Sequence, residues 1–130
     1  MSANDTQVGG SHYRSGFQHW DLAHELDLGY FEGQITKYIT RHRFKNGEVD
    51  ARKALHFARK LRELAVLEDR RPRHKYATIG RMTDFATDNK LNGKELLILV
   101  SVCNWSTVPD LDMLIDRILG LIDDHYPLAD

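Results

Sequence analysis

The sequence predicts an all-α protein, in which an N-terminal loop and an αα-hairpin precede a C-terminal segment of three helices. Apolar residues recur three or four positions apart over most of the chain, which is the spacing of one helix face. The turn dipeptides Asn46-Gly47 and Asn92-Gly93 separate such segments, and the flanks of the first do not alternate as half-buried strands would. Both observations favour helices joined by short turns.

The first half of the chain is expected to hold three helices. A short one covers residues 20–28, with Asp21 as its cap and Gly29 as its C-terminal glycine. A second covers 31–44 and a third 48–68, each with an apolar stripe at helical spacing. The short turn between the last two makes them an αα-hairpin.

The second half is expected to hold helices at residues 83–90, 94–105 and 109–125, the last with Pro109 in its first turn. The middle one is nearly all apolar from 96 to 102. A helix that is apolar all round must be covered on all sides, which favours a homo-oligomer.

Composition shifts divide the chain into four parts. Residues 1–8 are a polar tail, expected to be flexible, and 9–68 form the first helical domain. Residues 69–76 are a charged linker that contains a proline, and 77–130 form the C-terminal helical segment. We expect the two helical parts to pack as one globule or to meet at an oligomer interface.

The bulk composition excludes some classes of protein. The 18 Lys and Arg residues are balanced by 19 Asp and Glu, so duplex nucleic acid is not an expected partner. The lone Cys103 is expected to be a buried small hydrophobe. No apolar stretch approaches the roughly 18 residues of a membrane span, and the N-terminus is polar. We therefore expect a cytoplasmic protein, in the host cytoplasm if a phage encodes it.

A glycine-rich loop has the chemistry of a phosphate site. Consecutive glycines let backbone N–H groups point into one concavity, and the residues that follow add a hydroxyl, a titratable ring and a ring able to stack on a base. The alternative is a plain loop followed by a packed tyrosine. The loop comprises Gly9, Gly10, Ser11, His12 and Tyr13.

Cations line one face of the second predicted helix. Gln34, Lys37 and Arg41 lie at positions i, i+3 and i+7, and Lys45 follows the helix end. Arginine binds phosphate through two hydrogen bonds and lysine as a point charge. Such a row is expected to bind a phosphate chain, or else to be an ordinary solvated face.

Asp50 begins a second row on the third predicted helix, followed by Lys53, Phe57 and Lys60. It is a candidate to hold Mg²⁺ beside phosphates, to accept a proton, or to orient Lys53 or Arg41. It equally suits the first turn of a helix, where an acid complements the helix dipole.

Possible metal ligands gather at residues 19–25, where His19, Asp21 and His24 stand within one helical segment. Their spacing matches no strong zinc pattern, so no metal site is predicted there. The chain also has no ordinary phosphate-binding loop of the Gly-x-x-x-x-Gly-Lys-Ser/Thr type. Any nucleotide site must therefore be built differently.

Five short blocks between residues 8 and 67 stand out together: Val8-Gly9-Gly10-Ser11-His12-Tyr13, Gln18-His19-Trp20-Asp21, Gly33-Gln34-Ile35-Thr36-Lys37-Tyr38-Ile39-Thr40-Arg41, Lys45-Asn46-Gly47 and Asp50-Ala51-Arg52-Lys53-Ala54, closing at Leu61. In this order they resemble the SaV-like family of bacteriophage proteins, which is largely of unknown function. The rest of the chain resembles no family that we can name.

The resemblance implies nucleotide chemistry. One family member, from a short-tailed phage, is a nucleotide kinase that phosphorylates deoxynucleoside monophosphates without an ordinary phosphate-binding loop. Two positions depart from the family pattern: His19 stands where proline is usual, and Gln34 where asparagine is usual. The matching residues here are Ser11, His12, Tyr13, Lys37, Tyr38, Arg41, Lys45, Asp50 and Lys53.

Three hypotheses follow, and whether the protein is an enzyme stays open among them. The first is a phage nucleoside-monophosphate kinase that uses ATP and Mg²⁺, with Lys37, Arg41 and Asp50 as catalytic residues. The second is a non-catalytic protein that sequesters a nucleotide or nucleotide signal in counter-defence. The third is an oligomeric host-interaction protein. Under the first two, the ligand is held by Gly9, Gly10, Ser11, His12, Tyr13, Gln34, Lys45 and Lys53. Under the first, Arg41→Ala is expected to abolish turnover and leave the fold intact.

Overall fold

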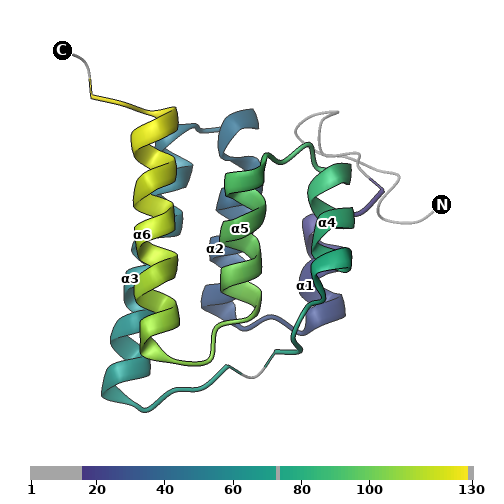
Figure 1. Ribbon diagram of the computed structural model, residues 1–130. Coiled ribbons are helices and arrows are strands. Elements are labelled where there is room, and N and C mark those ends of the chain that lie inside the picture. Colours follow the sequence, from purple (N-terminus) through teal and green to yellow (C-terminus); the bar gives the residue numbers. More distant parts are fainter. Residues whose placement is uncertain (1–15, 73, 129–130) are drawn as a thin grey trace.

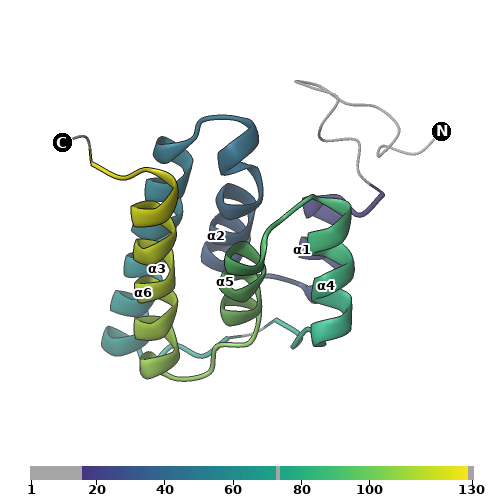
Figure 2. The same cartoon turned by 45° about the horizontal axis from the view of Figure 1, so that its top comes forward.

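Six α-helices form two layers of three in the computed structural model, which describes residues 16–72 and 74–128 (Figure 1). One layer holds α1, α2 and α3, and α4, α5 and α6 lie against them in the same order (Figures 1 and 2). No strand occurs in these ranges, so the predicted all-α class is confirmed. The helices are α1 (His19–Leu26), α2 (Tyr30–Arg41), α3 (Glu48–Leu67), α4 (Ile79–Asp88), α5 (Gly93–Cys103) and α6 (Val108–His125), with a short 3₁₀ helix, η3 (His42–Phe44), after α2.

The start of α4 differs most from the prediction, which placed it at Thr83. The helix begins at Ile79 because the hydroxyl of Thr78 accepts a hydrogen bond from the backbone N–H of Arg81 at 3.1 Å. Such a cap satisfies one of the free N–H groups of the first turn. Gly80 is a poor helix former, which concealed that turn from the apolar pattern.

The two ends of α1 are built differently from the prediction. Asp21 stabilises the start of α1 from the third helical position, where its carboxylate accepts from the backbone N–H of Gln18 at 2.9 Å. The left-handed residue that ends α1 is Asp27, at φ 54°, and Gly29 instead precedes α2 with an ordinary φ of −67°. A Cβ at this position would lie 2.6 Å from Oε1 of Glu32, so a larger residue would have to displace this buried carboxylate.

One apolar core joins the two layers. The linker from α3 to α4 is hydrogen-bonded to both layers. The backbone N–H of Lys75 donates to the carbonyl of Leu26 at 2.8 Å, and Nε2 of His74 donates to the carbonyl of Cys103 at 2.9 Å. Cys103 itself is fully buried, as the sequence predicts. The largest fully buried side chains come from both sides of the linker: Leu22, Ile35, Ile39, Leu61, Met82, Phe85, Ile98, Leu99, Trp105, Leu111, Leu114 and Ile118.

The apolar helix α5 is covered from within the chain. It packs against α2, α4 and α6, and of its apolar run only Leu97 is half exposed. The apolar surface of α5, which suggested an oligomer, is thus largely covered by helices of the same chain. Assembly into a homo-oligomer stays a prediction. In the part of the chain that the structure describes, no helix combines the length and the apolar character needed to cross a membrane.

Candidate functional site

The predicted cations of α2 and α3 converge on the ring of Tyr38. The ring centroid lies 4.6 Å from Nζ of Lys37 and 4.7 Å from Cζ of Arg41, both on α2. Nζ of Lys53, on the neighbouring helix α3, lies 5.3 Å from it. We call Lys37, Arg41, Lys53 and Tyr38 the basic cluster. The spacing on each helix and the antiparallel packing of α2 on α3 together produce it.

The ring of Tyr38 is the platform that holds these charges together. It stacks on Phe57 of α3 at a centroid distance of 6.0 Å and an interplanar angle of 12°. A cation over an aromatic face gains about 0.5–1 kcal/mol at an exposed site. That attraction offsets part of the repulsion among the three positive groups.

Asp50 fixes the guanidinium of Arg41. The Nε of Arg41 donates to Oδ2 of Asp50 at 3.1 Å and Nη2 donates to Oδ1 at 3.4 Å. The Asp50 side chain is fully buried, and the backbone and side-chain N–H groups of Asn46 donate to the same two oxygens at 3.3 and 3.5 Å. Among the roles that the sequence allowed for Asp50, this geometry favours the orientation of Arg41.

The two lysines of the basic cluster keep their charges available. Neither Lys37 nor Lys53 forms an ion pair with another residue in the described ranges. Arg41 has five N–H donors, of which two bond Asp50. An anion at this surface would therefore meet two ammonium groups and one edge of a pre-oriented guanidinium.

The other predicted binding residues lie around the basic cluster or outside the described ranges. Gln34 is half-buried one helical turn before Lys37, and Lys45 is exposed where η3 ends. The loop residues Gly9, Gly10, Ser11, His12 and Tyr13 lie outside the described residues, so their part in any site stays a prediction.

A cleft of about 860 Å³ between α1 and α4 has the opposite character. Arg81 lies over the ring of Phe17 at 4.0 Å and is paired with Glu25 at 2.7 Å. Since carboxylates outnumber cations in this lining, a phosphate would be repelled here and attracted by the basic cluster. The acidic lining residues are Asp21, Glu25, Asp84 and Asp88.

His19 of α1 is hydrogen-bonded to α2. Its Nε2 lies 2.6 Å from the hydroxyl of Thr36, which donates to the carbonyl of Glu32 at 3.0 Å. Burial, and secondarily the charge of Lys37, lower the pKa of His19 to about 4, so the ring is neutral near pH 7. Within the described residues, no three His, Cys, Asp or Glu side chains are grouped so that they could hold a metal ion.

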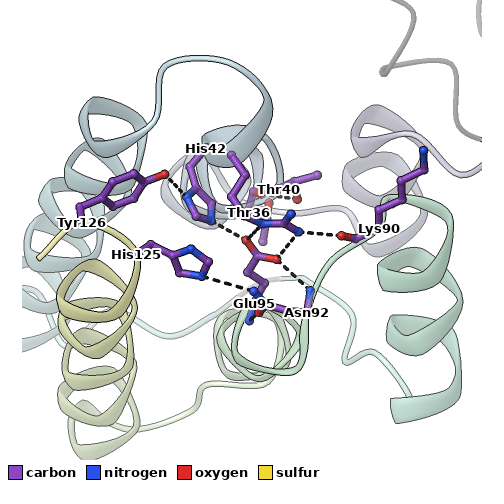
Figure 3. A network of polar contacts seen from close by, with 9 residues as sticks. Thr36, Thr40, His42, Lys90, Asn92, Glu95, His125 and Tyr126 are labelled. Carbon is purple, nitrogen blue, oxygen red and sulfur yellow. Dashed lines mark hydrogen bonds and ion pairs between the residues drawn. The ribbon is translucent and has the colours of Figure 1, made fainter.

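A buried polar network at one end of the helices was missed by the sequence reasoning (Figure 3). Glu95 of α5, fully buried, accepts from Nε2 of His42 at 2.5 Å, and from Nε and Nη2 of Arg43 at 2.9 and 2.8 Å. The backbone N–H of Asn92 also donates to it, at 2.8 Å. The one signal in the sequence was the pattern Asn-x-x-Glu, a capping box at the start of an otherwise apolar helix.

The network continues to the end of α6. The hydroxyl of Tyr126 bonds Nδ1 of His42 at 2.7 Å, and the ring of His125 meets that of His42 edge-on at 5.3 Å (Figure 3). Burial and, after it, the charge of Glu95 raise the pKa of Tyr126. The hydroxyl thus stays protonated. Because Arg43 neutralises Glu95, this network is suited to stabilising the packing of η3, α5 and the end of α6.

A second buried cluster joins α2 to the linker and to the turn between α5 and α6. The indole N–H of Trp105 donates to Oε2 of Glu32 at 3.0 Å, and Nδ1 of His74 lies 3.7 Å from the same oxygen. Oε1 of Glu32 and Nδ1 of His74 are buried without a hydrogen-bond partner in the described part of the chain. Nothing in the local sequence pattern indicated this cluster, because its members come from three separate segments.

Comparison of the chain with models of protein families, with curated proteins and with solved structures finds no match. The resemblance to the SaV-like family therefore stays a prediction. The case for a function rests on the geometry of the described residues.

Proposed function

We propose that the protein binds a phosphate-bearing nucleotide on the surface formed by α2 and α3. The observation that carries this proposal is the convergence of Lys37, Arg41 and Lys53 on the Tyr38 ring, with two of the three cations unpaired by any described carboxylate. Three cations around one aromatic ring, one of them a fixed guanidinium, supply the point charges and the fork of N–H donors that bind phosphate.

Binding without phosphoryl transfer is the form of the proposal that the geometry supports best. A kinase would need ATP and Mg²⁺, and it would need a carboxylate to hold the metal ion or accept a proton. Asp50 is the carboxylate that pairs with Arg41 of the basic cluster, and both of its oxygens are engaged by Arg41 and Asn46. Releasing them would leave a buried charge unpaired. A protein of this kind would sequester its nucleotide rather than convert it.

The test is calorimetric titration with deoxynucleoside monophosphates, followed by incubation with ATP and Mg²⁺ and chromatography of the products. We expect binding that the double variant Lys37→Ala/Lys53→Ala weakens at least tenfold, with the nucleotide recovered unchanged. The matched control is Arg59→Ala, which removes an exposed cation from α3 about 120° around the helix from Lys53.

Two results would contradict the proposal. Equal affinity in the parent and the double variant would show that the basic cluster is not the site. A diphosphate product that depends on Lys37 and Lys53 would replace sequestration by the kinase hypothesis.

A further inference from the structure

The basic cluster stands at one end of a longer row of aromatic rings. Phe57, which stacks on Tyr38, also meets Phe31 at 6.3 Å and Tyr30 at 6.0 Å, and the last two rings meet edge-on at 5.3 Å. We call Tyr30, Phe31, Phe57 and Tyr38 the aromatic row. It follows α2 for eight residues, which is about 12 Å along the helix.

The far end of the aromatic row combines an exposed tyrosine with a second cation. Tyr30 is 63% exposed, although tyrosine rings commonly bury their apolar body. Arg70, which follows α3, lies over the ring of Phe31 at 5.3 Å. Its neighbour Asp69 is paired with Arg71 at 3.6 Å, so part of the nearby negative charge is already neutralised.

Cations therefore stand at both ends of the row, and Tyr30 exposes its side chain at the same end as Arg70. Tyr30 and Lys37 are seven residues apart on α2, about 10 Å along the helix axis, so a ligand with a base on Tyr30 must extend along the helix to place a phosphate at the basic cluster. A nucleoside triphosphate has the length, but it carries its phosphates at one end only. A ligand that carries phosphates at two points along its length fits both groups of cations, with one of its bases on Tyr30.

We propose that the ligand of this surface is a short single-stranded nucleic acid, whose phosphates meet Lys37, Arg41 and Lys53 at one end and Arg70 at the other while a base stacks on Tyr30. The inference rests on the proposed function and names its ligand class. Single-strand binding without sequence preference commonly combines backbone-tracking cations with aromatic rings on which bases stack. The overall charge of −1 agrees with a local site rather than a duplex-binding surface.

The experiment measures fluorescence anisotropy of labelled oligodeoxythymidylates of increasing length, in competition with thymidine monophosphate, thymidine triphosphate and a duplex of the same length. We expect affinity to rise from the monophosphate to about a tetranucleotide and then to level off. Tyr30→Ala should weaken oligonucleotide binding about tenfold and leave the affinity for the monophosphate unchanged. Tyr30→Trp should retain it.

The matched control is Tyr76→Ala, because Tyr76 is 61% exposed and lies outside the row. It should leave every affinity unchanged. Arg70→Ala should reduce the slope of the logarithm of the binding constant against the logarithm of salt concentration by about one phosphate contact.

The outcomes separate this inference from the proposed function. Monophosphate binding that depends on Lys37 and Lys53, without any gain from added length, would overturn the inference and leave the proposed function standing. Equal affinity for duplex and single strand, or a Tyr30-dependent gain for the triphosphate alone, would also overturn it. Binding of none of these ligands would refute both.

Discussion

Replacing Glu95 by glutamine tests whether the buried network stabilises the fold. The carboxylate accepts from Nε2 of His42, from two nitrogens of Arg43 and from the backbone N–H of Asn92. Glutamine keeps the shape but has one acceptor oxygen and no charge, so it loses about two of these bonds. Hydrogen bonds to charged groups contribute about 1.5–3 kcal/mol each, and Arg43 stays partly solvated. We therefore expect the free energy of unfolding to fall by about 3 kcal/mol.

The pKa of Glu95 shows how the contribution of these same hydrogen bonds depends on pH. Burial alone would raise this pKa, but the hydrogen bonds from His42, Arg43 and Asn92, with the charge of Arg43, outweigh it and lower the pKa from 4.5 to about 2. That lowering corresponds to roughly 3 kcal/mol of stability. Since the folded pKa is the lower one, this stabilisation is fully present above about pH 4.5 and is lost as the pH falls through about 2.

Urea unfolding followed by far-ultraviolet circular dichroism measures both effects. The parent and Glu95→Gln should differ by about 3 kcal/mol near pH 7 and by less than half as much near pH 3. Glu63→Gln is the control, because Glu63 is an exposed carboxylate whose ion pair with Lys60 lies on the surface, and it should change stability by less than about 1 kcal/mol. A Glu95→Gln protein within about 1 kcal/mol of the parent, or a difference independent of pH, would refute the reasoning.

Three further predictions concern single side chains. Arg41→Ala leaves the fully buried carboxylate of Asp50 without its guanidinium partner, so it should lower the unfolding free energy by about 2–4 kcal/mol in urea titration. This differs from the sequence analysis, which expected the variant to keep its fold intact. An unchanged midpoint would show that the ion pair is dispensable. Gly29→Ala should lower the melting temperature, since the new Cβ meets the buried Glu32 carboxylate at 2.6 Å. Gly33→Ala, with open space around it, should instead raise stability by up to about 1 kcal/mol. The reverse order of the two melting temperatures in a thermal scan would contradict this. Burial and the charge of Glu32 raise the pKa of the Cys103 thiol to about 12, so a thiol reagent near pH 8 should label Cys103 only after denaturation, and rapid labelling of the native protein would disprove that protection.

The helices could be predicted from the sequence because their signals are local. The apolar stripes of α2, α3 and α6 recur within each helix, so periodicity alone placed them within a few residues. Gly29 was misjudged because a glycine before a helix and one after it look alike in sequence. Here α1 ends at the left-handed Asp27, two residues before Gly29, and an aspartate in that conformation is not visible in the apolar pattern.

The candidate site was predictable in part for the same reason. Lys37 and Arg41 share a face by helical spacing, and the pairing of Arg41 with Asp50 was one of several roles that the sequence left open. The stacking of Phe57 on Tyr38 needs the packing of α2 on α3, which the spacing does not fix.

The buried networks were beyond local reasoning. His42 and Glu95 are 53 positions apart, and His42 and Tyr126 are 84 apart. Each of these residues is unremarkable among its neighbours, since histidine and tyrosine occur on many helix surfaces. Only the arrangement of three helix ends at one pole of the molecule makes them partners.

The residues between the two layers have a consequence for how the chain can be divided. They cross from α3 to α4 with Arg71 exposed, while Lys75 and His74 bond residues of both layers. The two layers share one apolar core. The covalent linker therefore contributes mainly by keeping the layers at a high effective concentration relative to each other. A protease nick near Arg71 would thus yield two fragments that remain associated until dilution or denaturant separates them, and the same position is where an inserted sequence would disturb the helices least.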